Sequence, residues 1–203
     1  MRFAKPVVFV AALTPCLWLV FRALTGRLSA NPIEDITLTT GIWALRWLLV
    51  SLAITPLRRL TGWQRVIQYR RMFGLFAFFY ATLHLLTYVV LDQGLAFEFI
   101  LPDIVKRPYI TMGMIAFTLM IPLAVTSTKG WIRRLGRKWQ ILHRLVYVSA
   151  VAASLHFLWK VKVAIGEPVY YAAILTTLLA FRLLWRFRPG AGARSATARA
   201  SAS

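Results

Sequence analysis

The sequence predicts an all-α integral membrane protein, a bundle of six transmembrane helices. The first observation is composition: the 203 residues are 59% hydrophobic, with a mean hydropathy of +0.65, which is too apolar for a soluble domain. The second is length, because six apolar runs each approach the ~20 residues that a helix needs to cross ~30 Å of hydrocarbon. The third is the lack of strict alternation in these runs, which argues against a barrel, while open sheets do not span lipid.

The six expected spans are Pro6–Ala23, Gly41–Leu57, Met72–Leu91, Tyr109–Ser127, Gln140–Trp159 and Val169–Phe187. The first run could be a signal peptide, but it is long for a signal h-region and no clear small-residue cleavage site follows it directly. We therefore favour a retained helix. We expect residues 1–188 to form one membrane domain and the low-complexity residues 189–203 to form a disordered cytoplasmic tail.

Charge predicts the orientation of the bundle. The basic segments 1–5, 58–71, 129–138 and the tail after residue 182 contain no acid. All six acids fall in the alternate segments: Glu34, Asp35, Asp92, Glu98, Asp103 and Glu167. By the positive-inside rule, both termini are expected in the cytoplasm. This clustering explains the net charge of +19 better than nucleic-acid binding does.

Several kinds of chemistry are not supported by the sequence. The single cysteine, Cys16, permits no internal disulfide, zinc cluster or iron–sulfur site, and no Cys-x-x-Cys-His motif is present for covalent haem attachment. Glycine-rich nucleotide loops and nucleophile elbows are absent, so no catalytic residue is predicted. No internal repeat is apparent, which counts mildly against an inverted-repeat transporter.

All three histidines lie in spans three and five. An ionisable side chain within a span indicates a functional site, and a neutral imidazole is the usual axial ligand of haem iron in a helical bundle. The two spans run in the same direction, and His84 and His156 both lie toward the outer side. This matched depth predicts one haem held from opposite sides. The alternative is that each histidine only hydrogen-bonds to a neighbouring helix.

A second, inner layer is predicted from His143 and Arg70. His143 precedes His156 by thirteen residues, which is about 20 Å along a helix, and Arg70 precedes His84 by fourteen. Guanidinium is a poor iron ligand, so Arg70 is expected to bind a haem propionate or a flavin phosphate. Thirteen residues rotate a helix off its starting face, so stacking His143 under His156 requires a tilt, a local bulge or ligands that approach from different sides. The alternative for His143 is a solvated interfacial residue.

The outer segments 26–40 and 92–108 are the longest candidates for outer loops that dock a partner protein, and they hold five of the six acids. The alternative for each acid is that it only follows the orientation rule and faces water. Lys106 and Arg107 precede Pro108, where span four enters the membrane. They could bind haem propionates or form a docking surface with salt-dependent encounter.

Short motifs occur in a particular order along the chain: Asn31-Pro32 with Asp35-Ile36, Thr55-Pro-Leu-Arg-Arg59, Arg70-Arg71 with Gly74-Leu75, Ala81-Thr-Leu-His84, Arg107-Pro-Tyr-Ile-Thr111, Thr126-Ser127, Leu135-Gly136 with Trp139, and Leu142-His143 through His156 to Trp159 and Lys162. In this order and spacing they resemble the MsrQ (YedZ) family of haem-binding membrane subunits. That family belongs to the wider ferric reductase and NADPH oxidase transmembrane group. The resemblance covers nearly the whole chain apart from the tail.

The resemblance implies haem b, FMN, and electron delivery to a periplasmic, molybdenum-dependent MsrP partner that reduces methionine sulfoxide in oxidised proteins. Oxidases of the wider group carry two histidines on span three and two on span five, and Arg70 stands at one of these positions. The pair His84 and His156 is unaffected, whereas the haem count, one or two, stays open.

The expected function is therefore a membrane electron conduit, a non-catalytic subunit of an oxidoreductase complex, fed by the quinol pool or a cytosolic flavin reductase. One rival function is a stand-alone ferric or quinone reductase of the same group. Another, of a different class, is a transporter whose histidines relay protons.

Overall fold

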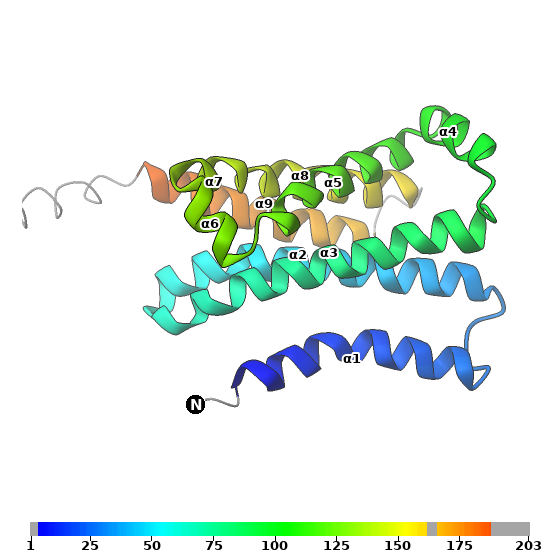
Figure 1. The fold of residues 1–203 in the computed structure, drawn as a ribbon, viewed down its shortest axis with the longest axis horizontal. Coiled ribbons are helices and arrows are strands. Elements are labelled where there is room, and N and C mark those ends of the chain that lie inside the picture. Colours follow the sequence, from blue (N-terminus) through cyan, green and yellow to red (C-terminus); the bar gives the residue numbers. More distant parts are fainter. Residues whose placement is uncertain (1–3, 162–165, 188–203) are drawn as a thin grey trace, which may run out of the picture.

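The structure, a computed structural model, describes residues 4–161 and 166–187. This part of the chain is helical without strands, and six of its helical segments are long and apolar enough to cross a membrane, as the sequence predicts. The long helices lie side by side in one bundle (Figure 1). The expected tail, residues 189–203, lies outside the described residues.

The elements follow one another in a simple order. They are α1 (Ala4–Leu24), α2 (Pro32–Thr61), the 3₁₀ helix η1 (Gln64–Tyr69), α3 (Arg70–Leu86), the π-helical segment η2 (Thr87–Asp92), α4 (Phe97–Lys106), α5 (Pro108–Val125), α6 (Lys129–Leu135), α7 (Arg137–Leu142), α8 (Leu145–Lys160) and α9 (Glu167–Arg186). The spans are α1, α2, α3 with its flanking η1 and η2, α5, α7 with α8, and α9.

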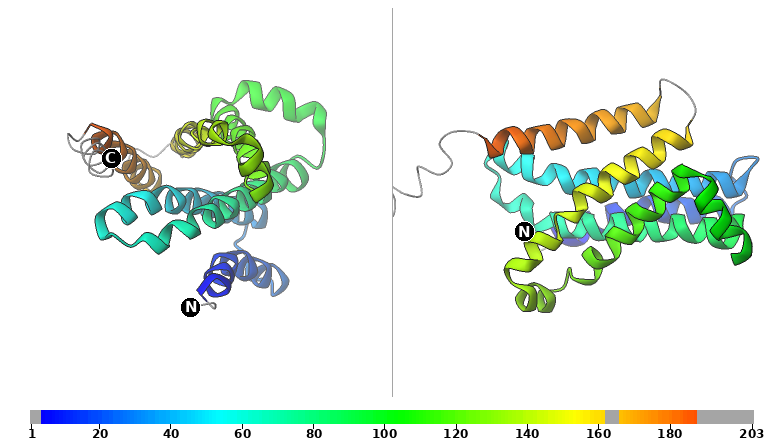
Figure 2. Two further views of the ribbon diagram at one scale, coloured as in Figure 1. Left: turned by 60° about the vertical axis from the view of Figure 1, so that its left-hand side comes forward. Right: turned by 90° about the horizontal axis from the view of Figure 1, so that it is seen from above.

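Two antiparallel helix pairs, α2 with α3 and α5 with α8, form the centre of the bundle (Figure 2). The core between them is built largely from the leucines of α2, and its buried members are Leu45, Leu48, Leu49, Leu52, Ala77, Met120, Ala150 and Leu175. Small alanines at these contacts allow the helix backbones to approach closely, which is the usual packing of helices in lipid.

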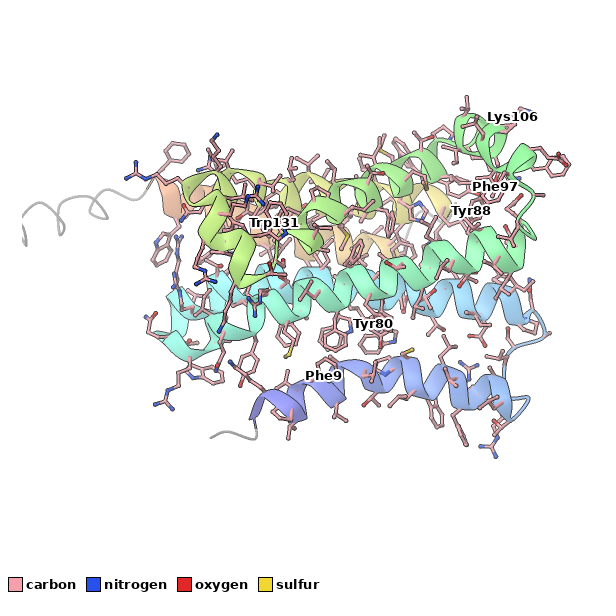
Figure 3. All side chains as sticks on the ribbon, viewed as in Figure 1. Phe9, Tyr80, Tyr88, Phe97, Lys106 and Trp131 are labelled. Carbon is pink, nitrogen blue, oxygen red and sulfur yellow. The ribbon has the colours of Figure 1, made fainter. Side chains whose placement is uncertain are left out.

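The outer helices α1 and α9 are attached to this centre by polar side chains. The Tyr80 hydroxyl donates to the carbonyl of Ala12 and accepts from the amide of Cys16, each at 3.0 Å, so it inserts into the backbone of α1 (Figure 3). On the other side, Arg46 donates to the Tyr171 hydroxyl at 2.7 Å and Arg182 donates to the Tyr147 hydroxyl at 2.7 Å. Both arginines lie within spans, where such polar contacts must be satisfied internally.

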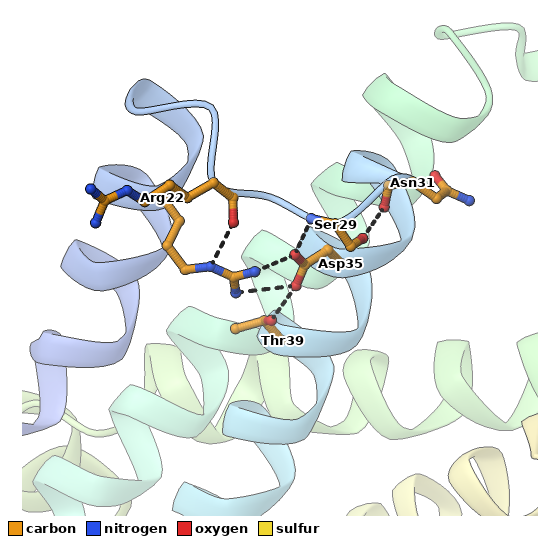
Figure 4. Close-up of polar contacts among 6 residues, drawn as sticks. Arg22, Ser29, Asn31, Asp35 and Thr39 are labelled. Atoms are coloured by element: carbon orange, nitrogen blue, oxygen red, sulfur yellow. Dashed lines mark hydrogen bonds and ion pairs between the residues drawn. The ribbon is translucent and has the colours of Figure 1, made fainter.

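The second span is longer than expected, because α2 begins at Pro32 rather than near Gly41. Asn31 caps it by accepting from the Glu34 amide, and Pro32, Glu34 and Asp35 suit a first helical turn. Asp35 is also fixed by Arg22 of α1, whose Nη2 lies 2.6 Å from Oδ2, and by the Ser29 amide (Figure 4). The outer segment 26–40 is therefore largely helix and not a loop, while its expected docking role stays a prediction.

The fifth span is interrupted, which corresponds to one of the three alternatives that the sequence left open for the relation of His143 to His156. A turn at His143 and Arg144 separates α7 from α8. Similarly, the segment 92–108, expected as a loop, contains α4. The described chain begins and ends at the same end of the bundle, beside α6 and α7, and α4 lies at the opposite end with the starts of α2 and α9 (Figure 1). The six acids fall in α4, in the first turns of α2 and α9, and at the end of η2.

Candidate cofactor site

His84 from α3 and His156 from α8 face each other across an apolar cavity. Their ring centroids are 5.9 Å apart and their planes are inclined by 79°. The remaining walls come from α2 and α5, and they are mostly aliphatic and aromatic side chains. The sequence prediction of matched depth on parallel spans agrees with this placement.

The hydrogen bonds of both rings assign the same tautomer. Nδ1 of His84 lies 2.9 Å from the Thr37 carbonyl oxygen, and Nδ1 of His156 lies 2.6 Å from that of Tyr109. Because a carbonyl can only accept, each Nδ1 carries the proton, and each Nε2 of the neutral ring keeps a lone pair. Within the described residues nothing hydrogen-bonds to either Nε2. A metal-ligating histidine characteristically donates its other nitrogen to a carbonyl in this way.

A glycine makes room for each ring. A Cβ added at Gly41 would lie 3.0 Å from the His84 ring, and one added at Gly113 would lie 2.8 Å from Nδ1 of His156. In an α-helix the amide of residue i+4 bonds to the carbonyl of residue i, so Gly41 and Gly113 are the helical partners of the same Thr37 and Tyr109 carbonyls. Each imidazole therefore rests against one bare helical turn and donates to its carbonyl.

The two half-sites are copies at a fixed offset of 72 residues, which relates Thr37, Gly41 and His84 to Tyr109, Gly113 and His156. Both histidine–carbonyl hydrogen bonds span 47 residues. The hairpin of α2 and α3 is thus repeated by that of α5 and α8, and a pseudo-two-fold axis along the bundle exchanges the histidines. The sequence analysis found no repeat because the equivalent positions share few residue identities.

The residues present fit a haem between the histidines. Metal–imidazole bonds of about 2 Å place two rings on opposite sides of one metal about 6 Å apart between centroids, close to the 5.9 Å observed. No group of three or more metal-ligating side chains exists within the described residues, so two imidazoles are the donor set, as for axial ligands of a macrocycle. The cavity encloses about 240 Å³, and flexible Met114 and Met120 in its wall can rotate to enlarge it.

Polar side chains line the cavity mouth at the end that carries α4. They are Tyr88, Asp92, Arg107 and Lys160. Arg107 forms an ion pair with Asp103, with Nε 2.7 Å from Oδ1, and donates to the Tyr109 hydroxyl at 3.3 Å. The Tyr109 hydrogen bond, together with the Asp103 charge, raises the pKa of Arg107, so the guanidinium remains charged. The propionate and docking roles of Arg107 both stay predictions.

His143 and Arg70 line a second cavity, of about 670 Å³, toward the opposite end of the bundle. The Thr126 hydroxyl donates to the Pro122 carbonyl at 2.6 Å and therefore accepts from Nε2 of His143 at 3.1 Å. The Trp139 ring stacks on His143, with centroids 3.9 Å apart. His143 thus has its Nε2 engaged, unlike the outer pair. Arg70 and His143 thus line one inner cavity, and no second histidine faces His143 in the described part of the chain; a cofactor layer there stays a prediction.

The sequence analysis did not identify the Thr37 and Tyr109 carbonyls, the two glycines Gly41 and Gly113, or Lys160 as part of the site. A backbone carbonyl belongs to every residue type, so the sequence cannot single one out. The glycines carried a usable signal, since an isolated glycine in an apolar helical run indicates close approach of another group.

The fold and the site define a polytopic membrane protein with a paired-histidine cofactor cavity between two repeated helix pairs. Residues 40–154 match the family described as the ferric reductase like transmembrane component. Heme-binding subunits MsrQ of protein-methionine-sulfoxide reductase are similar over most of the chain. The one from Xanthomonas axonopodis pv. citri is 50% identical and covers 98% of this chain and 92% of its own. That from Rhodospirillum rubrum is 53% identical and covers 90% and 88%, and that from Brucella ovis is 47% identical and covers 87% and 80%. The chain belongs to the MsrQ family, within the ferric reductase-like transmembrane group.

Proposed function

We propose that this protein is a haem b electron-transfer subunit of the bacterial inner membrane that supplies electrons to a periplasmic, molybdenum-dependent methionine sulfoxide reductase of the MsrP kind. The observation that carries the proposal is the facing pair of His84 and His156, each with a free Nε2. The relatives' names, which join haem binding to methionine-sulfoxide reductase, support the partner. Haem bound there would transfer single electrons, and this transfer does not require a proton to move with them.

The chain's own residues fix the geometry of this transfer. The Thr37 and Tyr109 carbonyls hold both rings in one tautomer and one orientation, which limits reorganisation when the charge of the site changes. The apolar walls from α2 and α5 exclude water. The site lies toward the end with α4, so electrons would leave on that side.

Charge supports the orientation of the bundle. The end with α6, α7 and η1 carries the basic segments and none of the six acids. By the positive-inside rule this end is cytoplasmic, and the end with α4 is periplasmic.

The inner cavity is the proposed entry point for electrons from the quinol pool or a cytosolic flavin reductase. Its walls include Arg70, Arg71, His143 and Arg144. Such cations suit the phosphate of FMN or the propionates of a second haem. Acid-released flavin fluorescence and a pyridine haemochrome assay, each divided by protein concentration, measure the FMN and haem content. Purified wild type with one haem per chain and no flavin would leave this cavity without a cofactor role.

The proposal is tested with purified His84→Ala and His156→Ala variants, and His143→Ala is the matched control. Each outer variant is expected to lose the low-spin Soret spectrum, while the control keeps the spectrum of the outer haem. Without oxygen, a catalytic amount of the MsrP partner should reoxidise reduced wild type only when methionine sulfoxide is also present.

Three results would contradict the proposal. A haem spectrum unchanged in either outer variant would reject the histidine pair. Reoxidation by ferric chelates or quinone alone, without dependence on the partner, would favour a stand-alone reductase. A wild-type protein without haem would favour a transporter with histidine proton relays.

A further inference from the structure

The pseudo-two-fold axis pairs two residues at the mouth of the outer cavity. Tyr88 follows His84 by four residues and Lys160 follows His156 by four. Four residues of an α-helix rise ~6 Å and return nearly to the same face, so Lys160 lies one turn beyond His156, and Tyr88, in the π-helical segment after α3, lies similarly beyond His84. Both residues line the cavity.

The other polar groups at this mouth already have partners. The Tyr88 hydroxyl donates to Oδ2 of Asp103 at 2.9 Å, and Oδ1 of the same carboxylate pairs with Arg107 at 2.7 Å (Tyr88 is labelled in Figure 3). The charge of Arg107 is therefore balanced within the protein. The Asp92 carboxylate accepts from the Gln93 side chain at 3.3 Å.

Lys160 differs from these groups because it has no ion-pair partner in the described part of the chain. The ion pairs among residues 4–161 and 166–187 are Arg22–Asp35 and Arg107–Asp103, so Lys160 has no carboxylate within ion-pair distance there, although Asp92 lines the same mouth. A lysine in the last turn of a helix is also stabilised by the helix dipole, which is the plain structural explanation for its presence. That explanation does not require a side chain at the cavity mouth.

We propose that Lys160 binds a carboxylate of the ligand in this cavity, namely one haem propionate, and so positions the haem; this rests on the proposed haem site. A haem has an approximate two-fold axis in its plane that passes between its propionates and exchanges its faces. The axis of the repeated hairpins exchanges His84 and His156 in the same way, which directs one propionate to the Lys160 side and the other to the Tyr88 side. An ammonium–carboxylate hydrogen bond is the charge-assisted kind.

The test compares two ligands in two proteins. Wild type and Lys160→Met are loaded with protohaem IX or with its dimethyl ester, which lacks both carboxylates, and transfer to excess apomyoglobin is followed spectroscopically. The variant should release protohaem about fivefold faster, the upper range for an exposed ion pair. The dimethyl ester should leave both proteins at the same rate, and Lys160→Arg should restore slow release of protohaem. Lys106→Met removes an outer-end lysine that does not line the cavity and should behave as wild type (Lys106 is labelled in Figure 3).

Two outcomes would overturn the assignment. Equal release of protohaem from wild type and Lys160→Met would mean that Lys160 makes no such contact. Faster release of both ligands from the variant would mean that Lys160 acts on the helix end alone. Failure of the proposed function is distinguishable, since wild type would then bind neither ligand.

Discussion

Gly113→Ala is expected to weaken haem binding although residue 113 cannot touch the iron. The new Cβ would lie 2.8 Å from Nδ1 and 3.1 Å from Cε1 of His156, whereas ordinary contacts begin at 3.4 Å. The ring must therefore move by roughly 0.6 Å, beyond the ~0.5 Å within which a binding constellation keeps its geometry. Overpacking of this kind costs about 1–3 kcal/mol, which corresponds to about fivefold to hundredfold weaker binding.

We expect this substitution to weaken haem binding and to leave the stability of the fold nearly unchanged. In the protein without haem no axial bond holds His156, so its ring can turn away and relieve the clash at the cost of its hydrogen bond to Tyr109, about 1 kcal/mol. In the haem-bound protein the axial bond fixes the ring, and the hydrogen bond to Tyr109 at 2.6 Å pins it against the same turn. Protein yield in membranes should therefore stay near wild type, while haem per chain falls and transfer to apomyoglobin accelerates.

Alanine substitutions at two other glycines provide a comparison for the effect on haem binding. At Gly41 the added Cβ lies 3.0 Å from the His84 ring, and at Gly74 it lies 3.5 Å from the Ser51 hydroxyl. Haem release should therefore be fastest from Gly113→Ala, intermediate from Gly41→Ala and unchanged in Gly74→Ala. Equal haem occupancy in the Gly113 and Gly74 variants would refute the reasoning, and so would an equal loss in all three.

The planes of the His84 and His156 rings are inclined by 79°. Nearly perpendicular imidazoles leave the iron π-orbitals almost degenerate, so the ferric haem should give a highly anisotropic EPR spectrum with one large g value. A well-resolved rhombic spectrum would contradict this prediction. His143→Ala should leave the outer haem spectrum intact and slow electron entry, and normal reduction kinetics would reduce His143 to an interfacial residue. Arg107→Ala should change haem release by less than about twofold, because an exposed, internally paired cation contributes little, while slower electron transfer to MsrP with weaker salt dependence would assign it to docking. Loss of haem from this variant would assign Arg107 to a propionate. A reporter fused after Ser203 should be active only as a cytoplasmic enzyme, and alkaline phosphatase activity there would overturn the orientation.

The bundle itself was predictable because hydrophobic length and histidine depth are properties of single helices. The sequence also showed that His143 and His156 cannot share one face of a straight helix, but it left open a tilt, a local bulge or ligands from different sides, and the structure has a turn at His143 and Arg144. The start of α2 was predicted too late because hydropathy ignores capping, although Asn31-Pro32 and the acids after it are helix-start signals.

The repeated half-site could not be predicted from the sequence, and the reason is physical. Each copy needs only a carbonyl, a glycine four residues later and a histidine 43 residues beyond the glycine. The carbonyl belongs to every residue type, so Thr37 and Tyr109 can differ completely in side chain and still accept the same hydrogen bond.

Residues that do not touch a ring differ between the copies, and at the mouth Tyr88 stands on one side and Lys160 on the other. Both copies therefore share the carbonyl, the glycine and the histidine that hold two nearly equivalent imidazoles in place. At the edge of the cavity the asymmetry is one of charge, which can distinguish one side of a nearly symmetric ligand from the other.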